Sequence, residues 1–185
     1  KVFMSRGLLA KLENEAQLAG VLGHEIAHVT ARHINDRMVG QQALGISLIA
    51  VGVAAQFSDE DYLNVLGVGV GAGGAFYMLS YGRDQELESD RIGVKYMARN
   101  GYNPWGQVQL MGELRQESSS RSGQLELLST HPLPKSRIKA LKKHIRTTYS
   151  DVKSNERYGY YAERFKKSVL DNLAQLPPPR HTGEK

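Results

Sequence analysis

Two histidines four residues apart, with a glutamate directly after the first, are the residues of this sequence best suited to chemistry. On a helix, one turn separates His24 from His28, so both imidazoles lie on one face and can reach the same metal ion. Glu25 then lies beside them, where it can take a proton from a water molecule. The segment 24–28 therefore has the HExxH pattern and predicts a helix that binds zinc and activates water.

The competing interpretation is a pair of buried histidines held only by hydrogen bonds. The pattern lies in the middle of a helix that we expect to be buried, as argued below. Two imidazoles and a carboxylate are costly to bury unless they are paired or bind an ion. The burial of the pattern therefore favours the metal site over a purely structural role.

A catalytic zinc site needs a third protein ligand and an open position for water. The chain has no cysteine, so this ligand must be His, Asp or Glu. The metzincin arrangement would place a histidine six residues after His28, but Ile34 stands there. His33 points about 140° away from His28 on a helical wheel, so we expect it at the surface or in packing.

A second helix, expected from about Arg83 to Arg99, offers a carboxylate as the third ligand. Glu86 and Asp90 lie four residues apart on one face of it. One carboxylate can then bind zinc while the other accepts a hydrogen bond from the far nitrogen of a ligand imidazole. Glu88 and other carboxylates compete on spacing alone, and a solvated charge cluster is the alternative, so the spacing leaves the third ligand open.

The helix that carries the histidines is expected to begin after Asn14, whose side chain can cap it, and to run to about Asn35. A wheel places bulky apolar residues on one side and small residues on another. Neighbours should then pack against both sides, which makes this helix central. The bulky stripe comprises Leu18, Leu22, Ile26 and Val29, and the small face comprises Ala16, Gly20, Gly23, Ala27 and Thr30.

Two long uncharged runs, 44–55 and 62–79, are separated by an acidic turn and predict a helical hairpin. The second run approaches the length of a membrane span, although it contains five glycines and Asn64. Hydropathy leaves two placements open: a hairpin that is buried or faces a partner, and a hairpin inserted in a membrane. Further helices are expected from Pro104, from Pro134 and around Phe165.

The length of 185 residues and the 41% hydrophobic content suit one domain of ordinary size. The net charge of +5 is uneven, because residues 135–167 carry eleven Lys or Arg against three acidic residues. Aromatic residues are not interleaved there in a binding pattern, so we expect solvated helix faces and no nucleic-acid partner. The alternating run at Val2–Met4 predicts a strand, and no signal peptide is recognisable.

Four motifs in a fixed order carry a resemblance to a known family. They are the run from Gly7-Leu8-Leu9 to Asn14-Glu15-Ala16, the HEIAHVTARH segment at 24–33, Arg83-x-x-Glu86-x-x-x-Asp90, and Thr130-His131-Pro132 followed by Arg137-Ile138. Over roughly residues 1–145 the chain resembles the gluzincin zinc metallopeptidase family of HtpX, BepA and the CAAX prenyl proteases. It is most similar to the soluble envelope members related to BepA. Ser89 stands where the family usually has Ala, an exchange between small residues.

The resemblance implies a fold of the α+β class, mostly helical. This fold is a zincin-like core with an HExxH active-site helix, a second ligand-bearing helix and a small N-terminal β-sheet. We expect this metallopeptidase domain at 1–150 and a basic helical extension with a tail at 151–185. By position, the resemblance implies His24, His28 and Glu86 as ligands of one Zn²⁺ and Glu25 as general base. It implies Asp90 as the acceptor that orients a ligand imidazole. It further implies Arg83 as an electrostatic link between the motifs and Arg137 as anchor of the loop that carries His131.

His131 lies in a predicted loop, where a histidine is usually only solvated. In the family, however, the matching loop comes near the metal. The resemblance therefore implies a site role, either as a stabiliser of the oxyanion or as a fourth ligand in a resting form.

The function implied is a zinc endopeptidase that hydrolyses unfolded or extended polypeptides in quality control of the bacterial cell envelope. The expected location is the periplasm, with any signal or anchor outside this chain. A membrane-associated protein partner is also compatible with the resemblance. The alternative is an assembly factor or chaperone with a latent, gated zinc site.

Overall fold

A computed structural model describes residues 3–56, 62–119, 131 and 134–177, and these residues are mostly helical. These residues form no β-strand, only an isolated parallel β-bridge between Tyr102 and Gly159. The helices are α1 (Arg6–Leu9), α2 (Glu15–Thr30), α3 (His33–Gln56), α4 (Tyr62–Arg99), α5 (Trp105–Ser119), α7 (Lys135–Thr148), α8 (Ala162–Phe165), the π-helical turn η1 (Lys166–Leu170) and α9 (Asp171–Ala174).

The small N-terminal β-sheet that we expected is not seen in the described part of the chain. Phe3 and Met4 are not in a strand, and Val2 lies outside the described residues. A strand needs a neighbour to pair its backbone groups, and these residues offer none. The predominance of helix is confirmed.

The predicted start of α2 is confirmed. Asn14 is the N-cap residue, and its Oδ1 accepts a hydrogen bond from the backbone N–H of Gln17 at 2.9 Å. The Gln17 side chain accepts in turn from the backbone N–H of Glu13 at 2.8 Å. These two hydrogen bonds satisfy donors at the helix start and fix where the HExxH segment lies along α2.

The predicted end of α2 is wrong, because the helix stops at Thr30 and not near Asn35. Arg32 adopts a left-handed conformation with φ of +58°, which a right-handed helix cannot continue through. The chain turns there, and α3 begins at His33. A helical wheel drawn for α2 therefore does not give the position of His33.

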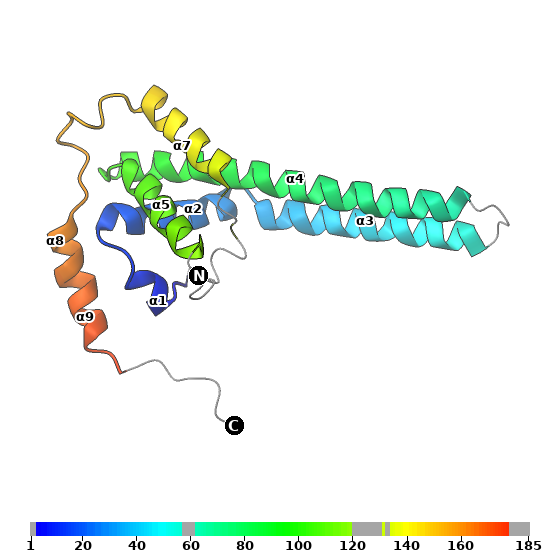
Figure 1. Cartoon of the computed structure of the whole chain (residues 1–185), viewed down its shortest axis with the longest axis horizontal. Helices are drawn as coiled ribbons and strands as arrows, with labels where there is room; N and C mark the ends of the chain where they lie inside the picture. The colour runs from blue at the N-terminus through cyan, green and yellow to red at the C-terminus, as the bar shows by residue number, and fades with distance from the viewer. Residues whose placement is uncertain (1–2, 57–61, 120–130, 132–133, 178–185) are drawn as a thin grey trace.

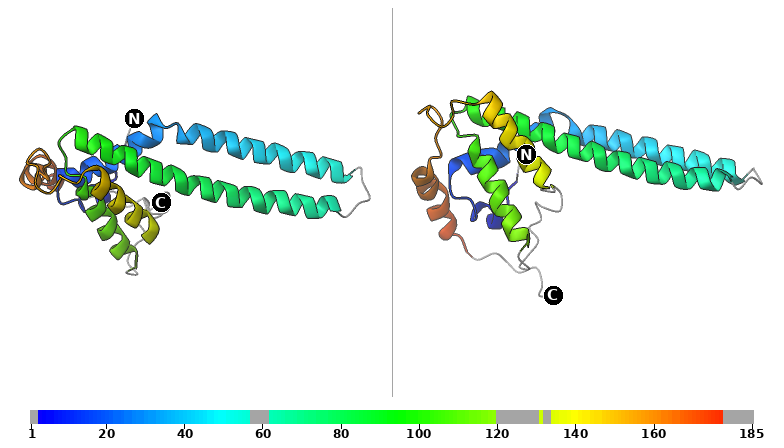
Figure 2. Two further views of the ribbon diagram at one scale, coloured as in Figure 1. Left: turned by 90° about the horizontal axis from the view of Figure 1, so that it is seen from above. Right: turned by 45° about the horizontal axis from the view of Figure 1, so that its top comes forward.

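α3 and α4 form a long antiparallel hairpin that projects from the rest of the molecule (Figures 1 and 2). The helical hairpin predicted from the uncharged runs is confirmed, and α4 continues from it without a break through the predicted Arg83–Arg99 helix. Three glycines of α4 lie against apolar side chains of α3 and leave room for close packing. The facing pairs are Gly67 with Val51, Gly71 with Leu48, and Gly74 with Leu44.

The outer face of α3 is exposed and apolar. Ile46 and Ile49 are 68% and 67% exposed, and Val53 is also exposed. The segment His33–Ala54 is 22 residues long and apolar enough to cross a membrane, and none of its most apolar window is buried within the chain. The outer face of α3 is therefore not covered by the part of the chain that the structure describes, and contact with a partner or a membrane stays open.

α2 packs on α4 through its small-residue face. A Cβ built on Gly23 would lie 3.0 Å from the carbonyl oxygen of Gly93, and one built on Gly93 would lie 3.0 Å from the backbone nitrogen of His24. The two backbones therefore touch beside the first histidine of the HExxH segment. The bulky stripe is less buried than we expected, since Ile26 is 42% and Val29 64% exposed.

Two apolar clusters hold the remaining helices around α2. The first joins α2, α4, α5 and α7, and the second joins α1, α2, α5 and the C-terminal segment, where Phe165 is fully buried. The predicted boundary at residue 150 stays a prediction. The first cluster comprises Ala16, Val94, Met97, Val108, Met111, Leu141 and Ile145, and the second comprises Leu8, Leu12, Val21, Leu110, Leu114 and Phe165.

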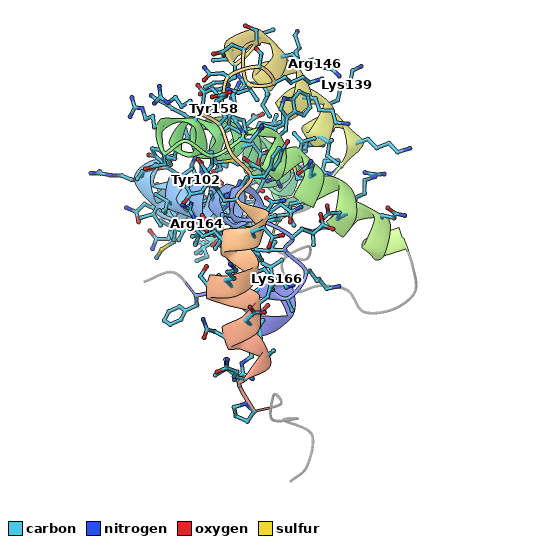
Figure 3. The ribbon with its side chains drawn as sticks, turned by 90° about the vertical axis from the view of Figure 1, so that its left-hand side faces the viewer. Tyr102, Lys139, Arg146, Tyr158, Arg164 and Lys166 are labelled. Carbon is cyan, nitrogen blue, oxygen red and sulfur yellow. The ribbon has the colours of Figure 1, made fainter. Side chains whose placement is uncertain are left out.

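The basic residues of the C-terminal third lie mainly at the end of the molecule opposite the hairpin (Figure 3). Lys139 and Arg146 project from α7, and Arg164 and Lys166 project from the C-terminal helical segment. Arg164 forms an ion pair with Glu15 of α2, which ties this segment to the core.

Gly93→Ala should destabilise the protein by about 1–3 kcal/mol, because the added methyl group would press on the backbone of α2. Gly112→Ala is the matched control, since nothing lies within 4 Å of a Cβ at that exposed position of α5. The control should be neutral or stabilising by up to about 1 kcal/mol. Urea unfolding of the three proteins measures the difference, and equal stabilities would contradict the tight crossing.

Candidate metal centre

Four side chains from three parts of the chain converge on one point. His24 and His28 come from α2, Glu86 comes from α4, and His131 precedes α7. One nitrogen or oxygen atom of each lies within 4.8 Å of all the others, and three of the four residues are buried. The structure therefore brings together the two motif histidines, the predicted carboxylate and the loop histidine.

The separations between the donor atoms suit a small tetrahedral ion. His28 Nε2 lies 3.1 Å from His24 Nε2 and 3.2 Å from Glu86 Oε1. His131 Nδ1 lies 3.3 Å from His24 Nε2 and 2.9 Å from Glu86 Oε1. Ligands about 2.0–2.1 Å from a zinc ion at tetrahedral corners are about 3.3 Å apart, so these residues fit zinc with little rearrangement.

Asp90 lies behind His24, one helical turn beyond Glu86. Its Oδ1 is 3.0 Å from His24 Nδ1, the ring nitrogen that faces away from the donor cluster. Gln107 of α5 donates a hydrogen bond to the same oxygen at 2.9 Å. An accepting carboxylate at this place favours the tautomer of His24 that leaves Nε2 free to bind a metal ion.

The guanidinium of Arg137, in the first turn of α7, bridges both carboxylates of α4. Its Nε is 2.6 Å from Asp90 Oδ2, and its Nη1 is 2.5 Å from Glu86 Oε2. All three side chains are buried. Since one cation faces two carboxylates, the cluster keeps an excess negative charge that a divalent cation would neutralise.

The carboxylates are ionised in spite of their burial. Burial raises the pKa of Glu86, but hydrogen bonds from the three imidazoles and the charge of Arg137 outweigh it and hold this pKa far below its usual range. Burial likewise opposes ionisation of Asp90, and the Arg137 guanidinium holds its pKa below the ordinary value. Glu86 Oε2 pairs with Arg137 and also lies 3.3 Å from His24 Nε2.

Comparison with known proteins identifies the family. The model of Peptidase family M48 matches residues 1–145, which is most of the chain. The chain belongs to peptidase family M48. Members of this family are zinc-dependent metalloendopeptidases, so the expected resemblance is confirmed.

Several relatives of this M48 chain are curated proteins. The beta-barrel assembly-enhancing protease (BepA) of Escherichia coli K12 is 35% identical over 146 residues, which cover 74% of the chain and 29% of that protein. The protein of the same name from Yersinia pestis is 36% identical over 141 residues, with the same coverage. The mitochondrial metalloendopeptidase OMA1 of Arabidopsis thaliana is 30% identical over 141 residues, covering 76% of the chain and 27% of that protein.

The M48 chain thus spans less than a third of the length of these relatives. The comparison with solved structures found no match.

Glu25 reaches the M48 site from the side of α2. Its side chain is partly exposed, and its Oε1 lies 3.4 Å from His131 Nε2. Glu25 is thus close to the donor cluster without belonging to it. A carboxylate in this position can exchange protons with a water molecule held at the cluster.

Arg137, and not Arg83, contacts the carboxylates of α4. Arg83 is exposed on α4, and within the described residues it makes no ion pair. Arg137, expected to anchor the loop, is the arginine that joins the two α4 carboxylates and contacts His24 at 3.3 Å. An arginine on the helix of Glu86 but not on its inner face cannot reach these carboxylates, whereas α7 crosses directly over them.

Sequence reasoning missed two residues at this site. His33 is buried beside His28, because the turn at Arg32 brings it back to the end of α2. Gln107 is buried on α5 and gave no recognisable signal in the sequence. The positive φ at Arg32 is a backbone property that residue spacing does not reveal.

An open cleft adjoins the metal centre on its α5 side. At one end it is lined by His24, Glu25, His131 and Arg137. The rest of its wall comes from α2 and α5 and is apolar except for Gln107. The apolar lining comprises Val21, Leu110, Met111 and Leu114.

Proposed function

We propose that this chain is the catalytic domain of a zinc endopeptidase that hydrolyses unfolded or extended polypeptides. His24, His28 and Glu86 would hold one zinc ion, and Glu25 would be the general base. The observation that carries the proposal is the convergence of these donors from α2 and α4, with Glu25 beside them. Membership of family M48 supports it.

The bound zinc would lower the pKa of a water molecule and polarise the scissile carbonyl group. Glu25 would take the proton from the attacking water as the new carbon–oxygen bond forms, and it would then deliver this proton to the leaving amine as the carbon–nitrogen bond breaks. Asp90 would keep the proton of His24 on Nδ1 throughout. Arg137 would hold both α4 carboxylates in place.

The cleft beside the metal centre supports a preference for substrates with an apolar side chain next to the cleaved bond. Its wall of Val21, Met111 and Leu114 suits an apolar side chain next to the cleaved bond. Unfolded chains expose such side chains, whereas folded proteins bury most of them. An extended polypeptide therefore fits the site better than a folded surface.

Glu25→Gln should reduce the cleavage of unfolded casein at least 100-fold while zinc is still bound, because the amide cannot accept the proton. Glu163→Gln, at an exposed position of α8, is the control and should cleave like the parent. Product formation is followed by gel and mass spectrometry, and bound zinc by elemental analysis. A Glu25→Gln variant that cleaves at the parental rate would show that another group is the base.

A second candidate function is favoured by His131. Its Nδ1 lies 2.9 Å from Glu86 Oε1 and belongs to the donor cluster, so it is placed to act as a fourth ligand. A site with four protein ligands has no open position for water. On this view the chain is an assembly factor or chaperone whose zinc site is latent until His131 moves away.

His131→Ala separates the two roles of this histidine. If His131 closes the site, the variant should cleave unfolded casein at least several-fold faster than the parent, because a position for water becomes free. If His131 stabilises the oxyanion, the variant should cleave about 100-fold more slowly. His144→Ala on the outer part of α7 is the control. Unchanged cleavage would contradict both roles.

We further propose that the domain works in the bacterial cell envelope, in the periplasm, with the α3–α4 hairpin in contact with a lipid bilayer. The envelope location is supported by the similarity to proteins named beta-barrel assembly-enhancing proteases. The bilayer contact is supported by the exposed apolar surface of His33–Ala54. At about 1.5 Å per residue this segment is about 33 Å long, close to the thickness of the hydrocarbon layer.

Flotation with vesicles of phosphatidylethanolamine and phosphatidylglycerol tests the bilayer contact. The parent chain should float with the vesicles, and Ile49→Glu should bind roughly tenfold more weakly, because a charge replaces an apolar side chain at an exposed position. Leu176→Glu, exposed at the opposite part of the chain, should bind like the parent. A parent chain that stays with the soluble fraction would contradict the contact.

A further inference from the structure

We propose that His33 is a positioning residue that holds the imidazole of His28 in its zinc-binding orientation. His33 is itself held by Glu88 and Ser89 of α4. The proposal rests on the proposed function, since it concerns the ligand role of His28. Asp90 orients the ligand His24. His28, in contrast, has no carboxylate behind its ring among the residues that the structure describes.

The backbone brings His33 to His28. The left-handed turn at Arg32 ends α2 and makes His33 the first residue of α3. The carbonyl oxygen of His33 accepts a hydrogen bond from Gln85 Nε2 at 3.2 Å, and Gln85 Oε1 accepts from Arg37 Nε at 2.7 Å. The start of α3 is thus tied to α4 beside the metal centre.

The His33 ring is buried, and both of its nitrogens have partners. His33 Nδ1 lies 3.0 Å from His28 Nδ1, and His33 Nε2 lies 3.2 Å from Glu88 Oε2. The hydroxyl of Ser89 is 3.2 Å from His33 Nδ1. A buried imidazole is costly unless its nitrogens are paired, and here the partners are His28 on one side and the carboxylate of Glu88 on the other.

The positions of the protons follow from the direction in which His28 faces. Its Nε2 points to the donor cluster, 3.1 Å from His24 Nε2, so Nδ1 carries the proton when Nε2 binds the metal ion. His33 Nδ1 then accepts this proton's hydrogen bond, and the proton of His33 lies on Nε2. The Nε2–H group of His33 then donates a hydrogen bond to the carboxylate of Glu88. One consistent set of tautomers therefore runs from Glu88 to the metal centre.

Ser89 takes part in the same arrangement. Its side chain is fully buried between α4 and His33, and its hydroxyl can donate to His33 Nδ1. Serine in place of the family's usual alanine at position 89 is therefore more than a change between small residues. It adds a hydroxyl that can donate to His33 Nδ1, the nitrogen that accepts from His28. When the Ser89 hydroxyl donates to Nδ1, it favours the same tautomer of His33, with the proton on Nε2.

Two substitutions of His33 separate positioning from packing. The amide oxygen of Asn matches the place of Nδ1, whereas that of Gln matches the place of Nε2. His33→Asn should keep zinc affinity within about threefold of the parent, and His33→Gln should lower it about 10- to 100-fold, the usual effect of losing a ligand's hydrogen-bond partner. Zinc affinity is measured by competition with a chelator at fixed pH. The visible spectrum of the cobalt-substituted protein should change only for His33→Gln.

The unfolding of the metal-free proteins reports the structural contribution, and it should be similar for the two variants. Glu88→Ala leaves the fold intact because Glu88 is exposed, and it should weaken zinc binding a few-fold. His144→Asn is the control for loss of a histidine away from the site. Equal zinc affinities for the parent, His33→Gln and Glu88→Ala would overturn the proposal, whereas a parent chain that binds no zinc would overturn the proposed function instead.

Discussion

The close crossing of α2 and α4 determines what this protein can do. The ligand pair on α2 is local, because one helical turn places His24 beside His28. The carboxylate that completes the group is about sixty residues away along the chain, at Glu86. Backbone contact at Gly23 and Gly93 brings the two helices near enough for a glutamate to reach both imidazoles. A larger side chain at either glycine would press on the facing backbone, which for Gly93 is that of His24 itself, and would move the donors apart.

Charge makes the crossing selective for a cation. Glu86 and Asp90 are buried and ionised, and Arg137 offsets only part of their charge. Removing Arg137 would leave both carboxylates without their cation, which is costly in a buried site. Its guanidinium therefore lets the fold keep two ionised carboxylates at the centre. Such an arrangement favours a bound divalent ion over an empty polar core.

Local signals in the sequence predicted the local parts of the structure. The HExxH spacing, the Asn14 cap and the end of α4 at Arg99, shortly before Gly101 with φ of +79°, each depend on a few neighbouring residues. The third ligand stayed open on spacing, because any of several carboxylates can lie on a helix face. It was the family resemblance that singled out Glu86.

Other features depend on tertiary structure and were not predictable in this way. The break at Arg32 is a backbone conformation in a segment whose side chains favour helix. The helical wheel assumed that the helix continues through this segment, so it gave the wrong direction for His33. The choice between Arg83 and Arg137 depends on how α7 crosses α4. Hydropathy left the surroundings of the hairpin open, and the described part of the chain does not cover the apolar outer face of α3.

The central claim is that a carboxylate of α4 and two imidazoles of α2 bind one metal ion together. Elemental analysis after dialysis against buffered zinc tests it most directly, with Glu86→Gln compared with Glu163→Gln at an exposed position of α8. The account predicts one zinc ion per chain in the parent and in Glu163→Gln, and loss of most of the zinc in Glu86→Gln. A Glu86→Gln variant that retains a full equivalent of zinc with parental affinity would contradict it.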